Sequence, residues 1–266
     1  MELEITDKLA ALSHPQRMAI FRLLMRRYPD ALPAGEVIEV LGVKPSTASV
    51  YLAALKSAGL IIQRREGTRL LYSANIAAAG DIMNGLFMDC CRGRIDLCPS
   101  LMPKPACTQD SKLKVLFVCT GNSARSVLAE TILTGLAPDR FDVYSTGTAP
   151  RPAVNENVVA LLHTKGHKTD HLFPKNITEF QTESAAVFDF IITVCDRAAN
   201  ENTPPWRGHP VLGHWGMPDP VETGDFGQCY DRLGTRLSAF SELPLETLDR
   251  HTLQTHVDSI GKMHIK

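Results

Sequence analysis

The first part of the chain carries apolar residues at helical spacing. Over residues 4–25 they recur at three- and four-residue intervals, and the pattern breaks at His14-Pro15, which predicts two helices. Residues 33–43 predict a short helix ended by a glycine. Residues 44–61 predict another helix, which starts with proline and Ser/Thr capping signals and ends at a glycine. The spacing of these last two helices is typical of a helix-turn-helix.

The pattern then changes from helix to strand. Two β-rich arms lie on either side of Glu66-Gly67, with arginines on both, and predict a β-hairpin. Residues 76–89 predict one more helix, which leads into the cysteine-rich stretch "CCRGRIDLC". Residues 99–112 hold three prolines and few large apolar side chains, so they should neither continue a helix nor join a central strand. We expect an interdomain linker there.

The second half alternates strand-like and helical patterns. The apolar runs read as buried strands, the stretches between them as helices, and the end of the chain as a last amphipathic helix. This alternation predicts a parallel sheet in an α/β fold. The predicted strands are residues 114–119, 141–148 and 188–196, and the predicted helices are residues 126–137, 155–166 and 243–263.

Two domains of different class are therefore expected in a chain that is α/β overall. Residues 1–98 should form a winged helix-turn-helix, mainly α with a β-hairpin wing. Residues 113–266 should form a three-layer α/β domain with a parallel sheet, and residues 99–112 should link the two.

Composition narrows the class of protein. The chain has 266 residues, 44% of them hydrophobic and 21% charged, which is typical of a globular protein. It shows no leader pattern and no apolar run long enough to span a bilayer, so we expect a cytoplasmic protein with no membrane partner. The seven cysteines are an odd number in local groups, which favours thiol or soft-ligand chemistry over disulfides. A small excess of basic residues in the first 98 hints at a nucleic-acid partner.

The stretch "VLFVCTGNSARS" carries the most specific chemistry. A strand ends at Cys119, five residues follow, and Arg125 and Ser126 open a helix. Five residues let the loop close into a ring whose N–H groups, together with the helix N-terminus, hold a tetrahedral oxyanion. Arg125 should return over the ring to bind two anion oxygens, and these charges should lower the pKa of the Cys119 thiol, with the Ser126 hydroxyl bonded to the thiolate. The oxyanion-binding ring consists of Thr120, Gly121, Asn122, Ser123 and Ala124.

Residues 113–260 resemble the low-molecular-weight phosphatases and, within that fold, the arsenate reductases. The resemblance is carried by "VCTGNSARS", "YSTGTAP", "FIITVCDRAANE" and "HWGMPDP". It implies that Asp219, which precedes a proline, protonates the leaving group. Phosphotyrosine enzymes tend to have aromatic residues just after this pair, whereas here Phe226 is the nearest one, so phosphotyrosine is not favoured.

The same resemblance implies that Cys119 forms an adduct with arsenate and that a second thiol releases arsenite. Cys195 matches the second cysteine of thioredoxin-coupled members, although a buried structural cysteine remains an alternative. The third cysteine of those members is missing, because Asn202 and Thr203 stand there, and Ala124 stands where relatives often have cysteine. No bound cofactor is expected, and the cycle needs an external thiol reductant: glutathione with glutaredoxin, thioredoxin or mycothiol.

Residues 5–98 resemble the winged-helix repressors of the ArsR type. The resemblance is carried by "ALSHPQRMAIFRLL", "GVKPSTASVYLAALKSAGLI" and "RREGTRLLYSA", and it implies operator DNA as a partner and a homodimer formed through this domain. We expect Ile82 and Leu86 to offer the apolar face for the dimer. The residues expected to contact DNA are Ser46, Thr47, Ser49 and Tyr51 on the recognition helix and Arg64, Arg65 and Arg69 on the wing.

Three cysteines after the last predicted helix point to a soft ligand. Cys90, Cys91 and Cys98 can bring three sulfurs together if Gly93 lets the chain fold back, and Cys107 is a further candidate. Three sulfurs leave no fourth ligand for tetrahedral zinc, whereas trivalent arsenic or antimony binds three. Some ArsR-type repressors carry a similar arsenite site after their last DNA-binding element.

The sequence thus predicts an arsenite-responsive repressor fused to an arsenate reductase, with arsenite as product of one domain and effector of the other. Two alternatives stay open. One is a protein or aryl phosphatase fused to a helix-turn-helix regulator. The other is a non-catalytic repressor whose C-terminal half senses an oxyanion without turnover.

Overall fold

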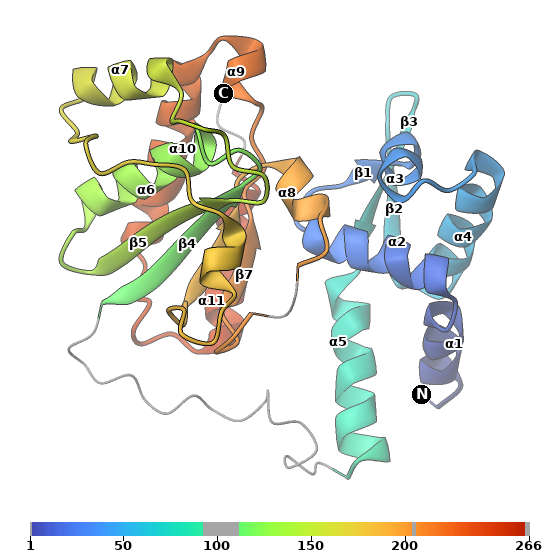
Figure 1. The fold of residues 1–266 in the computed structure, drawn as a ribbon. Helices are drawn as coiled ribbons and strands as arrows, with labels where there is room; N and C mark the ends of the chain where they lie inside the picture. The colour runs from blue at the N-terminus through green and yellow to red at the C-terminus, as the bar shows by residue number, and fades with distance from the viewer. Residues whose placement is uncertain (1, 93–111, 204–205, 264–266) are drawn as a thin grey trace. The chain divides into compact units, whose positions relative to one another are not determined.

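The computed structural model describes residues 2–92, 112–203 and 206–263, and the chain divides into two compact units, residues 1–107 and 108–266 (Figure 1). One unit is mainly helical with a small antiparallel sheet, and the other is an α/β unit with a parallel sheet. The predicted class, α/β overall with a helix-turn-helix at the N-terminal end, is confirmed.

The N-terminal unit contains the predicted helices. The first break falls at His14, which caps the second helix, and the third helix ends at Gly42 in the left-handed conformation with φ of 62°. The recognition helix starts at Pro45, but its N-cap is Lys44 without a side-chain hydrogen bond, so the expected Ser/Thr cap is wrong. These helices are α1 (Glu2–Leu12), α2 (Pro15–Arg26), α3 (Ala34–Leu41), α4 (Pro45–Ser57) and α5 (Ile76–Gly85), followed by the π-helical turn η1 (Leu86–Cys90).

The predicted hairpin forms the wing of this unit. Strands β2 (Ile61–Glu66) and β3 (Arg69–Ala74) pair antiparallel, with Glu66 opposite Arg69, and Gly67 takes a positive φ of 59° in the turn. A two-residue strand, β1 (Leu32–Pro33), adds to the other side of β3.

The expected dimer face is covered in part by the unit itself. Ile82 is buried in the hydrophobic core of the N-terminal unit, and Leu86 is half-buried and packs against that core. The apolar side chains that α5 and η1 do expose include Met83 and Met88, at 59% and 60% exposure. The predicted helix forms, and Ile82 on its apolar face contributes to the unit's own core, while the homodimer stays a prediction.

The C-terminal unit is built on a four-stranded parallel sheet in the order β5-β4-β6-β7. Three of the strands were predicted; the fourth was not, because its four residues include a glycine and a histidine and carry no strong β pattern. The strands are β4 (Leu113–Cys119), β5 (Phe141–Gly147), β6 (Phe190–Thr193) and β7 (Val211–His214).

Helices cover the sheet, with α6 packed on β4 and β5 and α11 packed on β7. The last helix begins at Arg250 with Asp249 as its N-cap, so the predicted start at residue 243 was too early. The long helix α10 was not predicted. The helical elements are α6 (Arg125–Leu136), α7 (Glu156–Thr164), the 3-10 turn η4 (Ile177–Phe180), α8 (Asp196–Asn200), α9 (Pro220–Thr223), α10 (Phe226–Ser241) and α11 (Arg250–Gly261).

The strand order places two sulfur atoms at one end of the sheet. Strand β4 lies between β5 and β6, so the order of the strands along the chain reverses beside β4. Open α/β proteins bind their ligands where the strand order reverses, at the carboxyl ends of the strands. Cys119 ends β4, and Cys195 follows two residues after the end of β6. In the part of the chain that the structure describes, no helix is both long and apolar enough to cross a bilayer.

Candidate active site

Cys119 lies at the bottom of the loop between β4 and α6. Its side chain is buried, and its Sγ lies 2.9 Å from the Oγ of Ser126 in the first turn of α6. The backbone N–H of Asn122 donates to the same sulfur, with N and Sγ 3.2 Å apart. The loop therefore wraps around the sulfur and directs hydrogen-bond donors at it, which is what a thiolate nucleophile requires.

The side chain of Asn122 holds the loop in this shape. Its Nδ2 donates to the Oγ atoms of Ser126 and Ser145, at 2.9 and 2.8 Å, and its Oδ1 accepts from the backbone N–H of Lys175 at 2.6 Å. Asn122 has a φ of 43°, a left-handed conformation that asparagine tolerates better than most residues. The ring expected from spacing alone is thus tied to β5 and to the segment around residue 175.

Two charged residues that the sequence interpretation missed extend this network. The Ser145 hydroxyl donates to Glu130, and the Glu130 carboxylate also pairs with the Lys175 ammonium at 3.3 Å. Both charged side chains are nearly buried. Ser145 lies in the quoted stretch "YSTGTAP", but nothing in the sequence indicates that Glu130 and Lys175 meet.

The segment after β5 clamps the loop from the other side. The N–H groups of residues 148, 149 and 151 donate to the carbonyls of Cys119, Thr120 and Gly121. This approach requires glycine at position 147, because a Cβ there would lie 2.5 Å from the Thr120 carbonyl oxygen. The stem of Arg151 also crosses Gly121, and its exposed guanidinium is a further cation near the loop that the sequence interpretation missed.

Arg125 is bonded to two acceptors of the protein itself. Its Nη2 donates to the Oδ2 of Asp219 at 2.6 Å, and its Nη1 donates to the Met217 carbonyl at 3.2 Å. Asp219 also caps α9 by accepting from the Val221 N–H at 3.0 Å. The structure therefore brings together the predicted proton donor, Asp219, and the predicted oxyanion clamp, Arg125. The Asp219 carboxylate is the anionic partner of Arg125 in this structure.

The expected low pKa of Cys119 is wrong in this structure. Burial raises the pKa of the Cys119 thiol, and the nearby Cys195 raises it further. Hydrogen bonds from Ser126 and Asn122 act in the opposite direction but do not outweigh burial. The hydrogen bonds follow from local spacing, whereas the burial of the sulfur depends on the folded sheet and helices around it.

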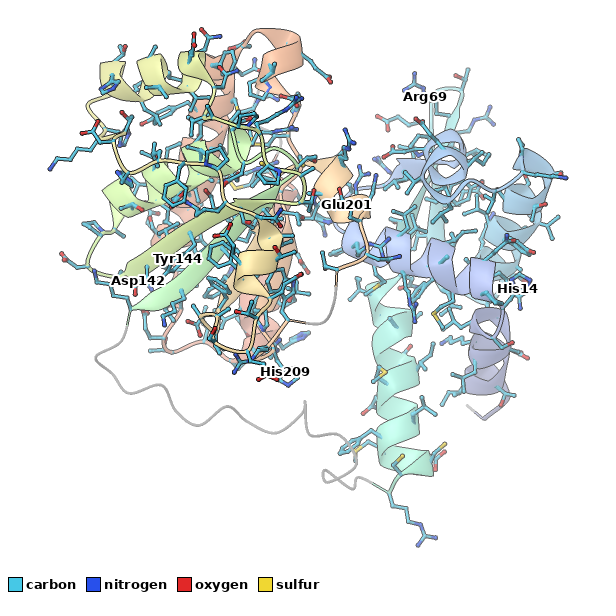
Figure 2. The ribbon with its side chains drawn as sticks, viewed as in Figure 1. His14, Arg69, Asp142, Tyr144, Glu201 and His209 are labelled. Carbon is cyan, nitrogen blue, oxygen red and sulfur yellow. The ribbon has the colours of Figure 1, made fainter. Side chains whose placement is uncertain are left out.

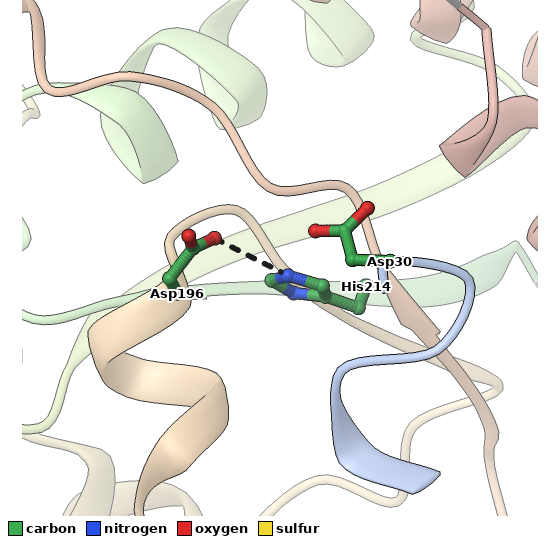
Figure 3. A group of neighbouring side chains, drawn as sticks. All are labelled: Asp30, Asp196 and His214. Carbon is green, nitrogen blue, oxygen red and sulfur yellow. Dashed lines mark ion pairs between the residues drawn. The ribbon is translucent and has the colours of Figure 1, made fainter. Parts of the chain in front are cut away.

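Cys195 lies next to the loop. It is the N-cap residue of α8, is buried, and its Sγ lies 3.4 Å from the Oγ1 of Thr120. Beside it, the buried His214 bonds Thr193 Oγ1 through Nδ1 at 2.8 Å and pairs through Nε2 with Asp196 at 3.4 Å (Figure 3). These contacts fix the strand end and the first residue of α8 on either side of the thiol.

A further thiol, Cys229, is buried in α10. Burial raises its pKa to about 12, and Arg125 and Asp219 are close enough to act on it in opposite directions. A sulfur that stays protonated at neutral pH is a poor nucleophile. No role was predicted for Cys229, and its high pKa gives no reason to assign one.

In the N-terminal unit, the residues predicted to contact DNA lie on α4 and the wing. Ser46 and Ser49 are exposed, while Thr47 and Tyr51 are half-buried, and the Ser49 hydroxyl donates to the Pro45 carbonyl at 3.0 Å. All three wing arginines are exposed. Arg64 pairs with Glu66 at 3.6 Å, the Nε of Arg65 donates to the Gly67 carbonyl at 3.1 Å, and Arg69 lies on β3 at the turn (Figure 2).

The cysteines predicted to bind arsenite are described in part. Cys90 is exposed and ends the π-helical turn, and Cys91 is half-buried. The chain bends at Arg92, which has a positive φ of 53°, one residue before the glycine expected to make that bend. Gly93, Cys98 and Cys107 lie outside the described residues, so the three-sulfur arrangement stays a prediction.

Comparison with known proteins assigns a domain family to each half of the chain. Residues 114–254 match the family model of the low molecular weight phosphotyrosine protein phosphatases, and residues 12–64 match a helix-turn-helix domain model. The chain belongs to the low molecular weight phosphotyrosine protein phosphatase family and carries a helix-turn-helix domain before the family's own domain.

The curated relatives that match the C-terminal half include arsenate reductases. Arsenate reductase 2 of Bacillus cereus is 30% identical over 141 residues, which cover 50% of this chain and 97% of that protein. An arsenate reductase from another Bacillus cereus strain is 31% identical over the same length and the same shares. Among solved structures, the arsenate reductase of Archaeoglobus fulgidus is 28% identical with a TM-score of 0.41, and the match covers 47% of this chain and 97% of that one.

Proposed function

We propose that the C-terminal unit is an arsenate reductase and that Cys119 is its nucleophile. The observation that carries this proposal is the Cys119 sulfur held by Ser126 and Asn122, with a second thiol, Cys195, beside the same loop. A phosphatase needs one thiol, whereas a reductase needs a second to complete the electron transfer. The names of the relatives support the same substrate.

The chemistry runs in two steps. Arsenate replaces the Asp219 carboxylate as the partner of Arg125. Asp219 takes up the proton of the Cys119 thiol, the thiolate displaces one arsenate oxygen, and that oxygen leaves as water with the proton returned by Asp219. A second thiolate then attacks the Cys119 sulfur. A disulfide forms, the sulfur–arsenic bond breaks, and its electron pair stays on arsenic, which falls from As(V) to As(III) and leaves as arsenite.

Cys195 is our candidate for the second thiol. Its backbone follows a strand that pairs directly with β4, and its sulfur contacts Thr120 of the ring. The disulfide then has to be reduced from outside by a thiol-redox partner: glutathione with glutaredoxin, thioredoxin or mycothiol. Reduction from outside also fits a cytoplasmic setting, in which thiols are kept reduced.

For the N-terminal part we propose DNA binding controlled by arsenite. Residues 1–98 would be the DNA-binding and arsenite-sensing domain of a homodimer, residues 99–112 a linker, and residues 113–266 the reductase domain. The exposed polar start of α4 and the three wing arginines support DNA binding. Cys90 and Cys91, with Cys98, would bind the arsenite that the other domain releases.

Phosphatase activity is the competing function, because Asp219 contacts Arg125, the arginine proposed to bind the oxyanion, and could give a proton to a leaving alcohol. A phosphotyrosine substrate is not favoured, because Phe226 packs against the core of the unit and is not free to flank a substrate ring. Rates of arsenite formation and of aryl phosphate hydrolysis by the full chain decide between them. Arsenate turnover well above phosphate hydrolysis is expected, and the reverse order would overturn the proposal.

A further inference from the structure

Two rings from different helices meet in the N-terminal unit. His14 is the N-cap residue of α2, and Tyr51 lies on the recognition helix α4 (Figure 2 labels His14). Their ring centroids are 4.7 Å apart, and the Nε2 of His14 lies 3.2 Å from the Tyr51 hydroxyl oxygen. The contact joins the beginning of one helix to the side of the helix proposed to read DNA.

The second nitrogen of His14 fixes the direction of this hydrogen bond. The backbone N–H of Gln16 donates to His14 Nδ1 at 3.2 Å, so Nδ1 carries a lone pair and no proton. A neutral imidazole then carries its proton on Nε2. That N–H donates to the Tyr51 oxygen, and the hydrogen of the Tyr51 hydroxyl is left to bond a different acceptor.

No protein acceptor for that hydrogen is found in the described part of the chain, where His14 is the hydroxyl's one hydrogen-bond partner. The position of Tyr51 indicates what it meets instead. Thr47 and Tyr51 are four residues apart and half-buried, whereas Ser46, Ser49 and Val50 are exposed, so Tyr51 lies at the flank of the outward face of α4. When a recognition helix lies in the major groove, its flanks face the phosphate backbone.

We propose that His14 is a positioning residue that sets the Tyr51 hydroxyl as a hydrogen-bond donor to a DNA phosphate oxygen. The inference rests on the proposed DNA binding and goes beyond it, since it assigns a role to His14 and a direction to the Tyr51 contact. The proposed hydrogen bond requires no carbonyl or carboxylate acceptor from the protein. The phosphate oxygen supplies the acceptor for the Tyr51 hydroxyl that the described residues do not provide.

The test uses the full chain and a random-sequence 30-base-pair duplex, with binding followed by fluorescence anisotropy over a range of salt concentrations. Tyr51→Phe keeps the ring and removes the hydroxyl, and we expect it to weaken binding about threefold to tenfold. The slope of log affinity against log salt should not change, because a neutral donor releases no counterion. Arg69→Gln is the matched control, and it should lower both the affinity and the slope.

His14→Asn separates positioning from folding. Its short side chain can still cap α2 but cannot reach Tyr51, so it should weaken binding in the wild type and have no further effect in Tyr51→Phe. A nitrogen-15 NMR spectrum of His14 should show the Nε2–H tautomer. Additive effects of the two substitutions, or the Nδ1–H tautomer, would overturn the positioning role while leaving DNA binding intact. Failure of the wild-type chain to bind the duplex at low salt would overturn both.

Discussion

Arg125 and Asp219 form an ion pair in which Nη2 and Oδ2 are 2.6 Å apart and both side chains are largely shielded from solvent. The same guanidinium is the group proposed to clamp the oxyanion. Because one arginine fork cannot serve both partners fully, Asp219 competes with the anion it later helps to convert. This relationship makes binding and turnover respond to Asp219 in opposite directions.

Replacing Asp219 by asparagine should therefore tighten binding of inorganic phosphate and slow arsenate turnover. The expected gain in phosphate affinity is about threefold to tenfold, since a partly buried charge pair is removed and Arg125 is left without its partner. Calorimetry with phosphate measures the affinity, and steady-state arsenite formation measures turnover. Asp225→Asn removes a nearby carboxylate charge but keeps an oxygen that can cap α10, so it is the control and should leave both nearly unchanged. Weaker phosphate binding in Asp219→Asn would contradict the competition.

Ser126→Ala should slow the reaction of Cys119 at neutral pH. The Ser126 hydroxyl lowers the pKa of the Cys119 thiol, so its removal raises that pKa and reduces the thiolate fraction, by about tenfold for each pKa unit. Alkylation of Cys119 by iodoacetamide, followed across pH, reports the thiolate directly. The profile of the variant should move to higher pH and approach the wild-type rate when both are ionised. A profile that stays in place would show that Ser126 does not stabilise the thiolate.

Gly147→Ala should remove activity. The added Cβ would lie 2.5 Å from the Thr120 carbonyl oxygen and 2.9 Å from the Asn122 nitrogen, so the ring must shift. Gly234→Ala is the matched control, because its Cβ meets no atom within 4 Å and alanine favours the helix by about 0.5–1 kcal/mol. Arsenate turnover and thermal unfolding should both fall in the first variant, and stability should rise in the second. Full activity of Gly147→Ala would argue against the clamp.

The stability of the C-terminal unit should fall with rising pH above about 9, in part through Cys229. The Cys229 thiol has a pKa of about 12 in the native state, whereas in the unfolded state its pKa is near the ordinary value of about 8.5. Between these two values the unfolded state holds fewer protons, so the free energy of unfolding decreases by up to about 1.4 kcal/mol per pH unit for this group. Urea unfolding at pH 8 and pH 10 should show a smaller loss in Cys229→Ala than in the wild type. Equal losses would contradict the raised pKa.

Replacing Cys90 and Cys91 by serine should leave DNA binding intact and remove the response to arsenite. In the wild type, arsenite is expected to lower DNA affinity by about 5- to 150-fold, the usual range of coupling between two ligands. An anisotropy titration with arsenite on preformed complexes measures this. Serine at Cys229 is the control and should not change the response. Normal release in the double variant would exclude Cys90 and Cys91 as ligands.

Much of the site was predictable because its signal is local. A run of apolar residues, a cysteine, five residues and an arginine at a helix start are contiguous, and the structure has the strand, loop and helix there. The network from Asn122 through Ser145 to Glu130 and Lys175 was not predictable, because its members come from four separate segments that only the folded sheet brings together.

Two other expectations failed for a shared reason. The pKa of Cys119 and the dimer face at Ile82 both depend on burial. Periodicity shows which face of a helix is apolar, but it does not show whether that face meets the chain's own core or a partner. Composition and spacing likewise predict which charged groups lie near a thiol, but they do not predict how deeply the thiol is buried.

Cys195→Ser should stop the reaction after the first step. Without the second thiol, arsenic should stay bound to Cys119, and mass spectrometry of the intact chain would show the adduct. Thr120→Val, which removes the hydroxyl next to the Cys195 sulfur and keeps the size of the side chain, is a milder control and should retain turnover. Unchanged arsenite release by Cys195→Ser with glutathione would show that an external thiol attacks Cys119 directly.

The most direct test of the central claim is the arsenic species formed when fully reduced chain is mixed with less than one equivalent of arsenate and no external thiol. Arsenic speciation after a single turnover should give arsenite from the wild type, together with a disulfide between Cys119 and Cys195, and no arsenite from Cys119→Ser. Equal arsenite from Cys119→Ser and the wild type would contradict the claim that Cys119 is the thiol that reduces arsenate.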